Sequence, residues 1–113
     1  MALTYGKLFE PAQLTTGAVT YYTVPLTPTT SLLRNGRIRL ANNTAGAVTV
    51  TVYAVPLSGT ASATNAILSA YSLAANSALD IDLPQMKAGD FLQALAGANA
   101  SISIHSIDGV IFS

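Results

Sequence analysis

Residues 48–55 read VTVTVYAV. Valine, threonine and tyrosine fill nearly every position of this run, and these β-branched and aromatic residues favour strands over helices. Side chains of a strand point alternately to its two sides, and here both alternating sets consist mainly of residues that favour burial. We therefore expect a β-strand that is covered on both faces, one by the core of the domain and one by a neighbour.

The same alternation recurs along the rest of the chain and predicts an all-β fold. Residues 78–83 and 101–107 alternate clearly, and weaker patterns occupy 18–24, 38–41, 67–73 and 91–96. Residues typical of turns separate these runs at 42–46, 75–77, 87–90, 97–99 and Asp108-Gly109. Seven to eight short strands at intervals of about 8 to 12 residues predict an antiparallel β-sandwich.

The arrangement of these strands favours one jelly-roll-like domain that spans residues 1–113. The longest irregular stretch, residues 56–65, lies in mid-chain with strands on both sides of it. The chain has no cysteine and no tryptophan, which argues against a true immunoglobulin domain. A length of 113 residues is typical of a single domain.

Two segments admit two interpretations each. Asn35-Gly36 suits either a hairpin turn between two short strands or a bulge within one strand from Ser31 to Ala41, and the shortness of the flanking runs favours the bulge. Residues 1–12 lack a clean period. They form either a docking arm for a neighbouring molecule or an edge strand of their own sheet.

The scarcity of charge points to association with other proteins. Only 9% of the residues are charged and 50% are hydrophobic, whereas globular domains carry roughly 25% charged residues. A surface with so few charges is poorly suited to solvent on all sides, so we expect a homo-oligomer or a larger assembly. The formal net charge is zero, which removes the usual electrostatic attraction to nucleic acid.

Several other classes of function are not expected. No run of about 18 apolar residues predicts a membrane span. The first residues lack the pattern of a signal peptide, so we expect synthesis and folding in a cytoplasm. The absence of cysteine excludes thiolate chemistry and disulfides. One histidine and no convergent polar motif give little basis for catalysis, and we expect no enzyme, no cofactor and no metal site.

Two charged doublets are the first interface candidates. Arg37 and Arg39 share the spacing of Asp80 and Asp82, and residues two apart in a strand lie on one face about 7 Å apart. The doublets therefore match one another, either across neighbouring strands or between subunits. A contact between subunits would be tested by reversing the charge of Asp82 together with that of Arg39.

Aromatic residues supply further interface candidates. Tyr21 and Tyr22 are adjacent, so one is expected in the core and the other on the surface. The aromatic candidates for contacts with a neighbour are Tyr22, Tyr53 and Phe9. His105 is out of phase with Ile102 and Ile104, so we expect it on the outside of the domain, where copies of it would meet only around a symmetry axis.

From Leu14 to Ala96 the chain resembles small β-sandwich proteins of tailed-phage virions. The segments that carry this resemblance are LTTG at 14–17, YTVP at 22–25, IRLANNT at 38–44, AVTVTV at 47–52, AIL at 66–68, SLAANS at 72–77 and KAGD at 87–90. The resemblance implies a structural virion protein, often a trimer, and it carries over no catalytic residue. The segment at 34–37 departs from the smooth apolar strand that the resemblance implies.

The first hypothesis is therefore a capsid decoration (cement) protein, which self-associates and stabilises the phage head. Its partners would be the major capsid protein or another virion protein, and it would be located in the virion after synthesis in the cytoplasm of the bacterial host. A tail, tail-fibre or head–tail connector component is the alternative. A carbohydrate-binding module is a second alternative, which exposed tyrosines in a concave patch would favour.

Overall fold

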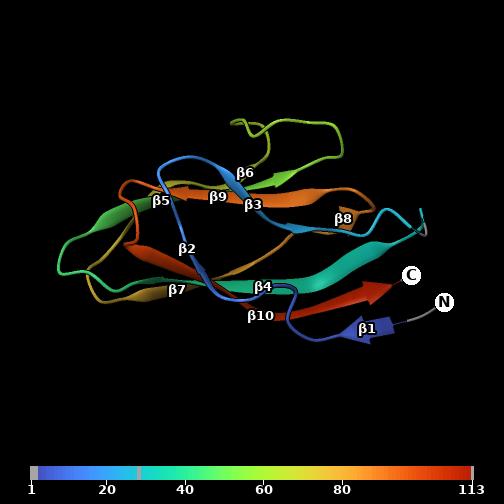
Figure 1. The fold of residues 1–113 in the computed structure, drawn as a ribbon, viewed down its shortest axis with the longest axis horizontal. Coiled ribbons are helices and arrows are strands. Elements are labelled where there is room, and N and C mark those ends of the chain that lie inside the picture. Colours follow the sequence, from blue (N-terminus) through green and yellow to red (C-terminus); the bar gives the residue numbers. More distant parts are fainter. Residues whose placement is uncertain (1–2, 28, 113) are drawn as a thin grey trace.

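The computed structural model describes residues 3–27 and 29–112 and shows two antiparallel β-sheets packed face to face (Figure 1). The described residues contain no helix. The strands are β1 (Leu3–Tyr5), β2 (Ala12–Gln13), β3 (Val19–Thr23), β4 (Leu32–Asn42), β5 (Val48–Val55), β6 (Ala66–Leu73), β7 (Ala78–Asp82), β8 (Met86–Lys87), β9 (Phe91–Ala96) and β10 (Ile102–Phe112).

The order of the strands is that of a jelly roll. One sheet, here called the β4 sheet, runs β1-β10-β4-β7, with β2 also beside β10 and β8 also beside β4. The other, here called the β5 sheet, runs β3-β9-β5-β6. The short pairs β1/β2 and β7/β8 each share one edge position, so the ten strands fill eight positions. The expectation of a jelly-roll-like antiparallel sandwich is confirmed.

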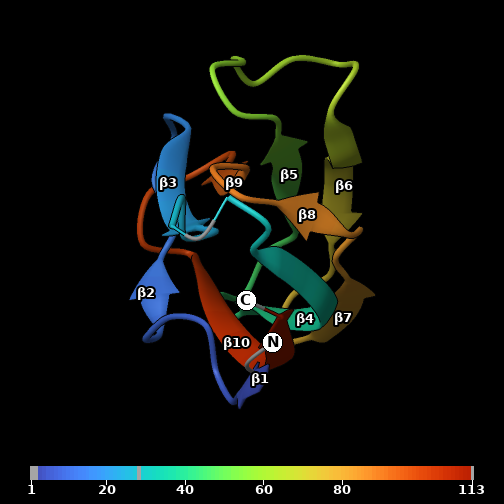
Figure 2. The same cartoon turned by 90° about the vertical axis from the view of Figure 1, so that its right-hand side faces the viewer.

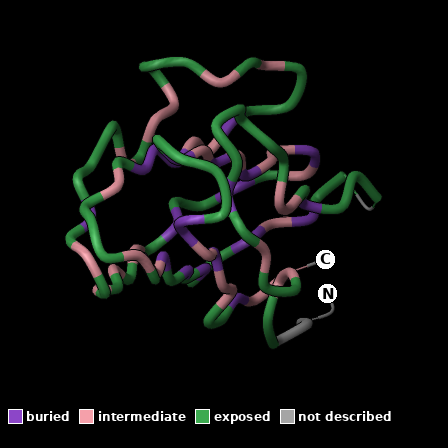
Figure 3. The backbone as a smooth tube through the Cα atoms, turned by 60° about the vertical axis from the view of Figure 1, so that its left-hand side comes forward, coloured by how far each residue is buried: buried purple, intermediate pink, exposed green. Residues whose placement is uncertain are grey.

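The core lies between the two sheets and is built from alternating residues of the central strands. Ile38 and Leu40 of β4, Val50 and Val52 of β5, and Ile104 of β10 are fully buried. In β9 every second residue is buried, which is the pattern of a strand with one face on a core. Figure 3 shows the buried positions concentrated between the sheets and the exposed positions in the loops.

Bulges resolve the ambiguity at Asn35-Gly36. β4 continues through both residues as one strand, and Asn35 adopts a positive φ of 55°. The pairing of β4 with β10 shifts register on both sides of Asp108. A Cβ on Gly36 would lie 3.1 Å from the Leu83 side chain, so the close approach of Leu83 leaves little room for a side chain there. The structure therefore contains the bulge and not the hairpin turn.

The expected turn at Asp108-Gly109 is also wrong, because these residues lie at a bulge within a strand. β10 runs through both residues to Phe112. A Cβ on Gly109 would meet the Leu8 side chain at 2.7 Å, so this glycine allows the N-terminal segment to cross closely. The sequence signal of a turn and that of a bulge are both a small residue beside a polar one, and only the pairing partner tells them apart.

The N-terminal segment forms an edge of the β4 sheet. β1 pairs with the end of β10, Leu3 opposite Phe112, and β2 pairs with Ser103 and Ile104. Residues 1 and 2 of the proposed docking arm lie outside the described residues. In this chain the segment is thus an edge strand, and docking of residues 1–12 on a neighbour stays a prediction.

Candidate interaction surface

Charge is divided unequally between the two sheets. The four strands of the β5 sheet contain 27 residues, and none of them is charged. An even spread of 9% charged residues would place two or three there. Seven charged residues instead lie on strands of the β4 sheet: Arg34, Arg37, Arg39, Asp80, Asp82, Lys87 and Asp108. The other three, Lys7, Glu10 and Asp90, lie in connecting segments.

The outer side of the β5 sheet is defined by its register. Leu92, Ala94 and Ala96 belong to the core cluster, so the alternate residues of β9 face outward. Cross-strand partners share a face, and Gln93 pairs with Tyr53 of β5 and Thr20 of β3. The Gln93 Nε2 donates a hydrogen bond to Thr20 Oγ1 over 2.9 Å. We call this side, with Thr20, Thr23, Thr49, Thr51, Tyr53, Phe91, Gln93 and Leu95, the uncharged face.

Exposed apolar side chains lie at the edges of the β5 sheet. Val19 of β3 and Tyr71 of β6 are 40% and 45% exposed, but they pair with Ala94 and Val50 of the core cluster and so belong to the inward side of the sheet. Ile67 of β6 is also exposed. Leu26 and Leu57, in the loops at one end of the sheet, are 55% and 53% exposed. Among the described large apolar residues that are exposed, only Ile107 lies on the β4 sheet.

A long loop between β5 and β6, residues 56–65, stands over the uncharged side of the sandwich (Figure 2). Its shape is fixed by Asn65, whose Nδ2 donates to the Thr60 carbonyl (2.9 Å) and whose Oδ1 accepts from the Ser62 amide (3.1 Å). At the base of the loop the Leu57 amide donates to Asp90 Oδ1 (3.0 Å). Asp90 also accepts from the Lys87 amide (2.9 Å), so one carboxylate joins two connections.

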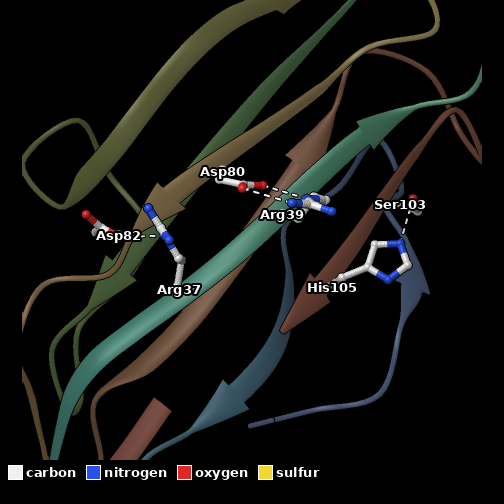
Figure 4. A network of polar contacts seen from close by, with 6 residues as sticks. All are labelled: Arg37, Arg39, Asp80, Asp82, Ser103 and His105. Carbon is white, nitrogen blue, oxygen red and sulfur yellow. Dashed lines mark hydrogen bonds and ion pairs between the residues drawn. The ribbon is translucent and has the colours of Figure 1, made fainter. Parts of the chain in front are cut away.

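The β4 sheet presents ion pairs (Figure 4). Arg39 of β4 holds Asp80 of β7 with two hydrogen bonds, 2.7 Å from Nε and 3.0 Å from Nη2. Arg37 lies 3.1 Å from Asp82 in the same register. The hydrogen bond from Arg39 lowers the pKa of the Asp80 carboxyl, and the same hydrogen bond raises the pKa of Arg39.

The charged doublets therefore pair across strands within one chain. The partner of Asp82 is Arg37, so a charge reversal that combines Asp82 with Arg39 would join residues of two different pairs. Both pairs are largely exposed, and exposed ion pairs add little to stability. A role of these four residues at an interface between subunits stays a prediction.

His105 lies beside these pairs on the outer side of β10. It is in register with Arg39, and its Nε2 lies 3.2 Å from Ser103 Oγ (Figure 4). Ile102 and Ile104 are fully buried, so the expected outward position of His105 is confirmed. The described residues contain no group of three or more His, Asp or Glu side chains arranged to hold a metal ion.

The aromatic candidates have different positions. Tyr53 lies on the uncharged face, whereas Tyr22 is in register with buried Leu92 and packs against the core. Phe9 also packs against the core, with its ring centroid 6.5 Å from that of Tyr21. A role at an interface stays a prediction for these three residues.

The expectation that Tyr21 and Tyr22 point to opposite faces is wrong. A bulge in β3 lies between Thr20 and Tyr22, and both tyrosines are half-buried against the core. Burial raises the pKa of both hydroxyls. The tyrosines whose side chains are described do not gather in one concave patch, the feature that a carbohydrate-binding module would need.

A small polar hollow lies at the bulge of β4. Its volume is about 360 Å³, and it is lined by Asn35, Gly36, Arg37, Asp82, Leu83 and Asp108. Its walls contain no aromatic ring on which a sugar or base would stack.

Among the described residues no helix is long and apolar enough to cross a membrane.

The fold is shared with solved structures of proteins that build large assemblies. One structure, described as Bacillus endospore appendages that form a novel family of disulfide-linked pili, is 17% identical with a TM-score of 0.56, over 98% of this chain and 88% of that one. The infectious bursal disease virus Gx strain matches at 15% identity and a TM-score of 0.52, over 97% of this chain and 32% of the viral chain. The T13 particle of the same virus matches at 13% identity and a TM-score of 0.50, over 96% and 30%.

These similarities establish the fold alone. The chain spans about a third of the length of the viral proteins, so nearly all of this chain matches one part of each viral chain. The disulfide linkage named for the pili has no counterpart here, because this chain has no cysteine. No known protein family and no curated protein matches the sequence.

The uncharged face is not predicted by any single residue of the sequence. The signal that was present is the absence of charge from all of 18–24, 48–55, 66–73 and 91–96. That signal gains meaning only once the topology shows these four segments to be one sheet.

Proposed function

We propose that this protein is a structural subunit of a virion, and more specifically a capsid decoration protein of a tailed phage. The observation that carries the proposal is the uncharged face. A surface of threonine, glutamine and half-buried aromatic and aliphatic side chains holds no charge that would lose its water on contact, and with exposed Leu57 at its edge it is suited to burial against protein.

The fold and the resemblance support the same role. The solved structures of similar fold are pilus and virus-particle proteins. The segments at 38–44 and 87–90, among others, resemble phage virion proteins. The resemblance also implies a trimer, and we retain that state as part of the proposal.

The mechanism would be thermodynamic. A protein that binds only the assembled shell stabilises it by mass action, by RT ln(1 + [L]/Kd), or about 2.7 kcal/mol when the free concentration is a hundred times Kd. An oligomer that contacts several capsid subunits gains further affinity from effective concentration. No side chain of the protein has to do chemistry in this mechanism, and we propose that it is not an enzyme.

Reconstitution on phage heads tests this proposal. Heads that lack the protein are mixed with the purified chain and washed. The number of bound copies per head is determined from the mass of the heads, and the thermal disruption of the heads is followed by light scattering. We expect hundreds of bound copies per head and a higher disruption temperature. A few copies at one vertex would instead indicate a tail or connector component, and a failure to bind any part of the particle would refute the virion assignment.

A further inference from the structure

We infer that the uncharged faces of two copies of this chain pack on each other around a two-fold axis that passes close to Gln93. This inference deepens the proposed structural role, because it names the partner and the surface of one contact in the assembly.

Charge selects the partner of this face. The opposite broad side of the sandwich carries the pairs Arg37–Asp82 and Arg39–Asp80, whose side chains are 32 to 81% exposed. Stacking the uncharged face on that side would remove water from these charges and give them no new partner. An uncharged face on an uncharged face incurs no such cost. The contact is therefore the same surface on both copies, which is the geometry of a two-fold dimer.

Area determines which other residues must take part. The 27 residues of the four strands, each about 3.3 Å long on strands about 4.8 Å apart, offer a flat area of about 430 Å². A specific interface buries about 800 Å² on each partner. The sheet alone is therefore too small, and the loop at 56–65 supplies the remainder. That loop stands on the side of the β5 sheet turned away from the β4 sheet (Figures 1 and 2).

The loop is built for such a contact. Asn65 restrains its second half through hydrogen bonds to Thr60 and Ser62, which lowers the conformational entropy lost when the loop is covered. Leu57, 53% exposed at its base, is the apolar side chain it brings to the edge of the face.

Gln93 is the residue at which the inference is tested. It lies on the central strand β9 between Thr20 and Tyr53, so a two-fold axis near it brings its two copies together. The masses of wild type, Gln93→Lys and Gln93→Glu are measured by light scattering after gel filtration, alone and as a one-to-one mixture. Gln13→Lys, on exposed β2 of the other sheet, makes the same chemical change away from the face and is the matched control.

We expect the wild type to contain an even number of 11.6 kDa chains: two, or six where the two-fold contact joins two of the proposed trimers. Each Gln93 variant should weaken the dimer at least a hundredfold, the mixture should recover at least tenfold of that loss, and Gln13→Lys should match the wild type. If the Gln93 variants lose their β-sheet signal in circular dichroism, Thr20→Lys and Thr20→Glu replace them, because Thr20 is an exposed neighbour on the same face.

A wild-type monomer or simple trimer overturns the two-fold contact, as does a mass unchanged by Gln93→Lys. A mixture that does not reassociate also overturns it. These results leave the proposed function standing if the wild-type chain still binds heads, whereas an even oligomer that binds no particle supports the contact and removes the virion role.

Discussion

Asn42 is a buried polar residue whose loss should damage the fold without touching the uncharged face. It is 1% exposed at the end of β4. Its Nδ2 donates to the carbonyls of Gly46 (2.9 Å) and Leu73 (3.0 Å), and its Oδ1 accepts from the amide (3.0 Å) and the hydroxyl (2.7 Å) of Thr44. One side chain thus joins the β4–β5 turn to the end of β6.

The loss of unfolding free energy in Asn42→Ala depends on which of these partners can form hydrogen bonds to water instead. The Thr44 hydroxyl has one proton and also lies 2.9 Å from the Gly46 carbonyl at an exposed site, so in the variant it can donate to that carbonyl and those two groups lose little. The Leu73 carbonyl is buried and the Thr44 amide partly so, and each unsatisfied buried group costs about 1–3 kcal/mol. We expect a loss of about 3 kcal/mol, which for a chain of this length lowers Tm by roughly 12 °C.

Urea denaturation at one fixed protein concentration measures this loss, because association would otherwise shift the apparent stability. Asn43→Ala is the matched control. Asn43 is the next residue and is exposed, and the hydrogen bond from its backbone N–H to the Ser101 carbonyl does not involve the side chain. The control should stay within about 0.5 kcal/mol of the wild type. Equal stabilities for the two variants would refute the assignment of Asn42 as the link between these loops.

Two further perturbations test other parts of the structure. Gly89 has a φ of +86°, and a Cβ there would lie 2.6 Å from Leu57, so Gly89→Ala should lower the free energy of unfolding in urea by about 1–3 kcal/mol. Gly46→Ala is the control and should be close to neutral, because there is open space around the added methyl group. Equal losses in the two variants would contradict the packing at Gly89. Asp80 has a lowered pKa, so the stability it adds is present above its unfolded value of about 3.9 and is lost as the pH falls through the folded value. Between about pH 5 and pH 2 the wild type should therefore lose more stability than Asp80→Asn, and parallel curves would show that the Arg39 contact does not form in solution.

The sequence was sufficient for the fold class because strand alternation is a local property. VTVTVYAV at 48–55 forms β5 as expected, and the matched doublets at 37/39 and 80/82 anticipated the pairing of β4 with β7. Their register was open, because equal spacing permits either residue of one doublet to oppose either residue of the other. Only the direction of the strands decides that Arg37 meets Asp82.

The bulges were harder to predict because their cause lies far away in sequence. Leu8, a hundred residues earlier, passes over Gly109 within β10, and no local signal shows this, because a glycine beside an aspartate usually indicates a turn. The bulge at Tyr21 was also hard to predict, because it is a shift in the pairing of β3 with the distant strand β9. This bulge puts two adjacent tyrosines against one core.

The low charge content is best understood as a property of one side of the molecule. The β4 sheet, with seven charged residues on its strands, is an ordinary water-facing surface. The strands of the β5 sheet have none, and its polar side chains find partners within the sheet: Gln93 bonds to Thr20, and Thr51 accepts from the Ala70 amide. Such a face tolerates water while the chain folds and loses little when it is covered. That combination suits a subunit that is made singly and then assembled.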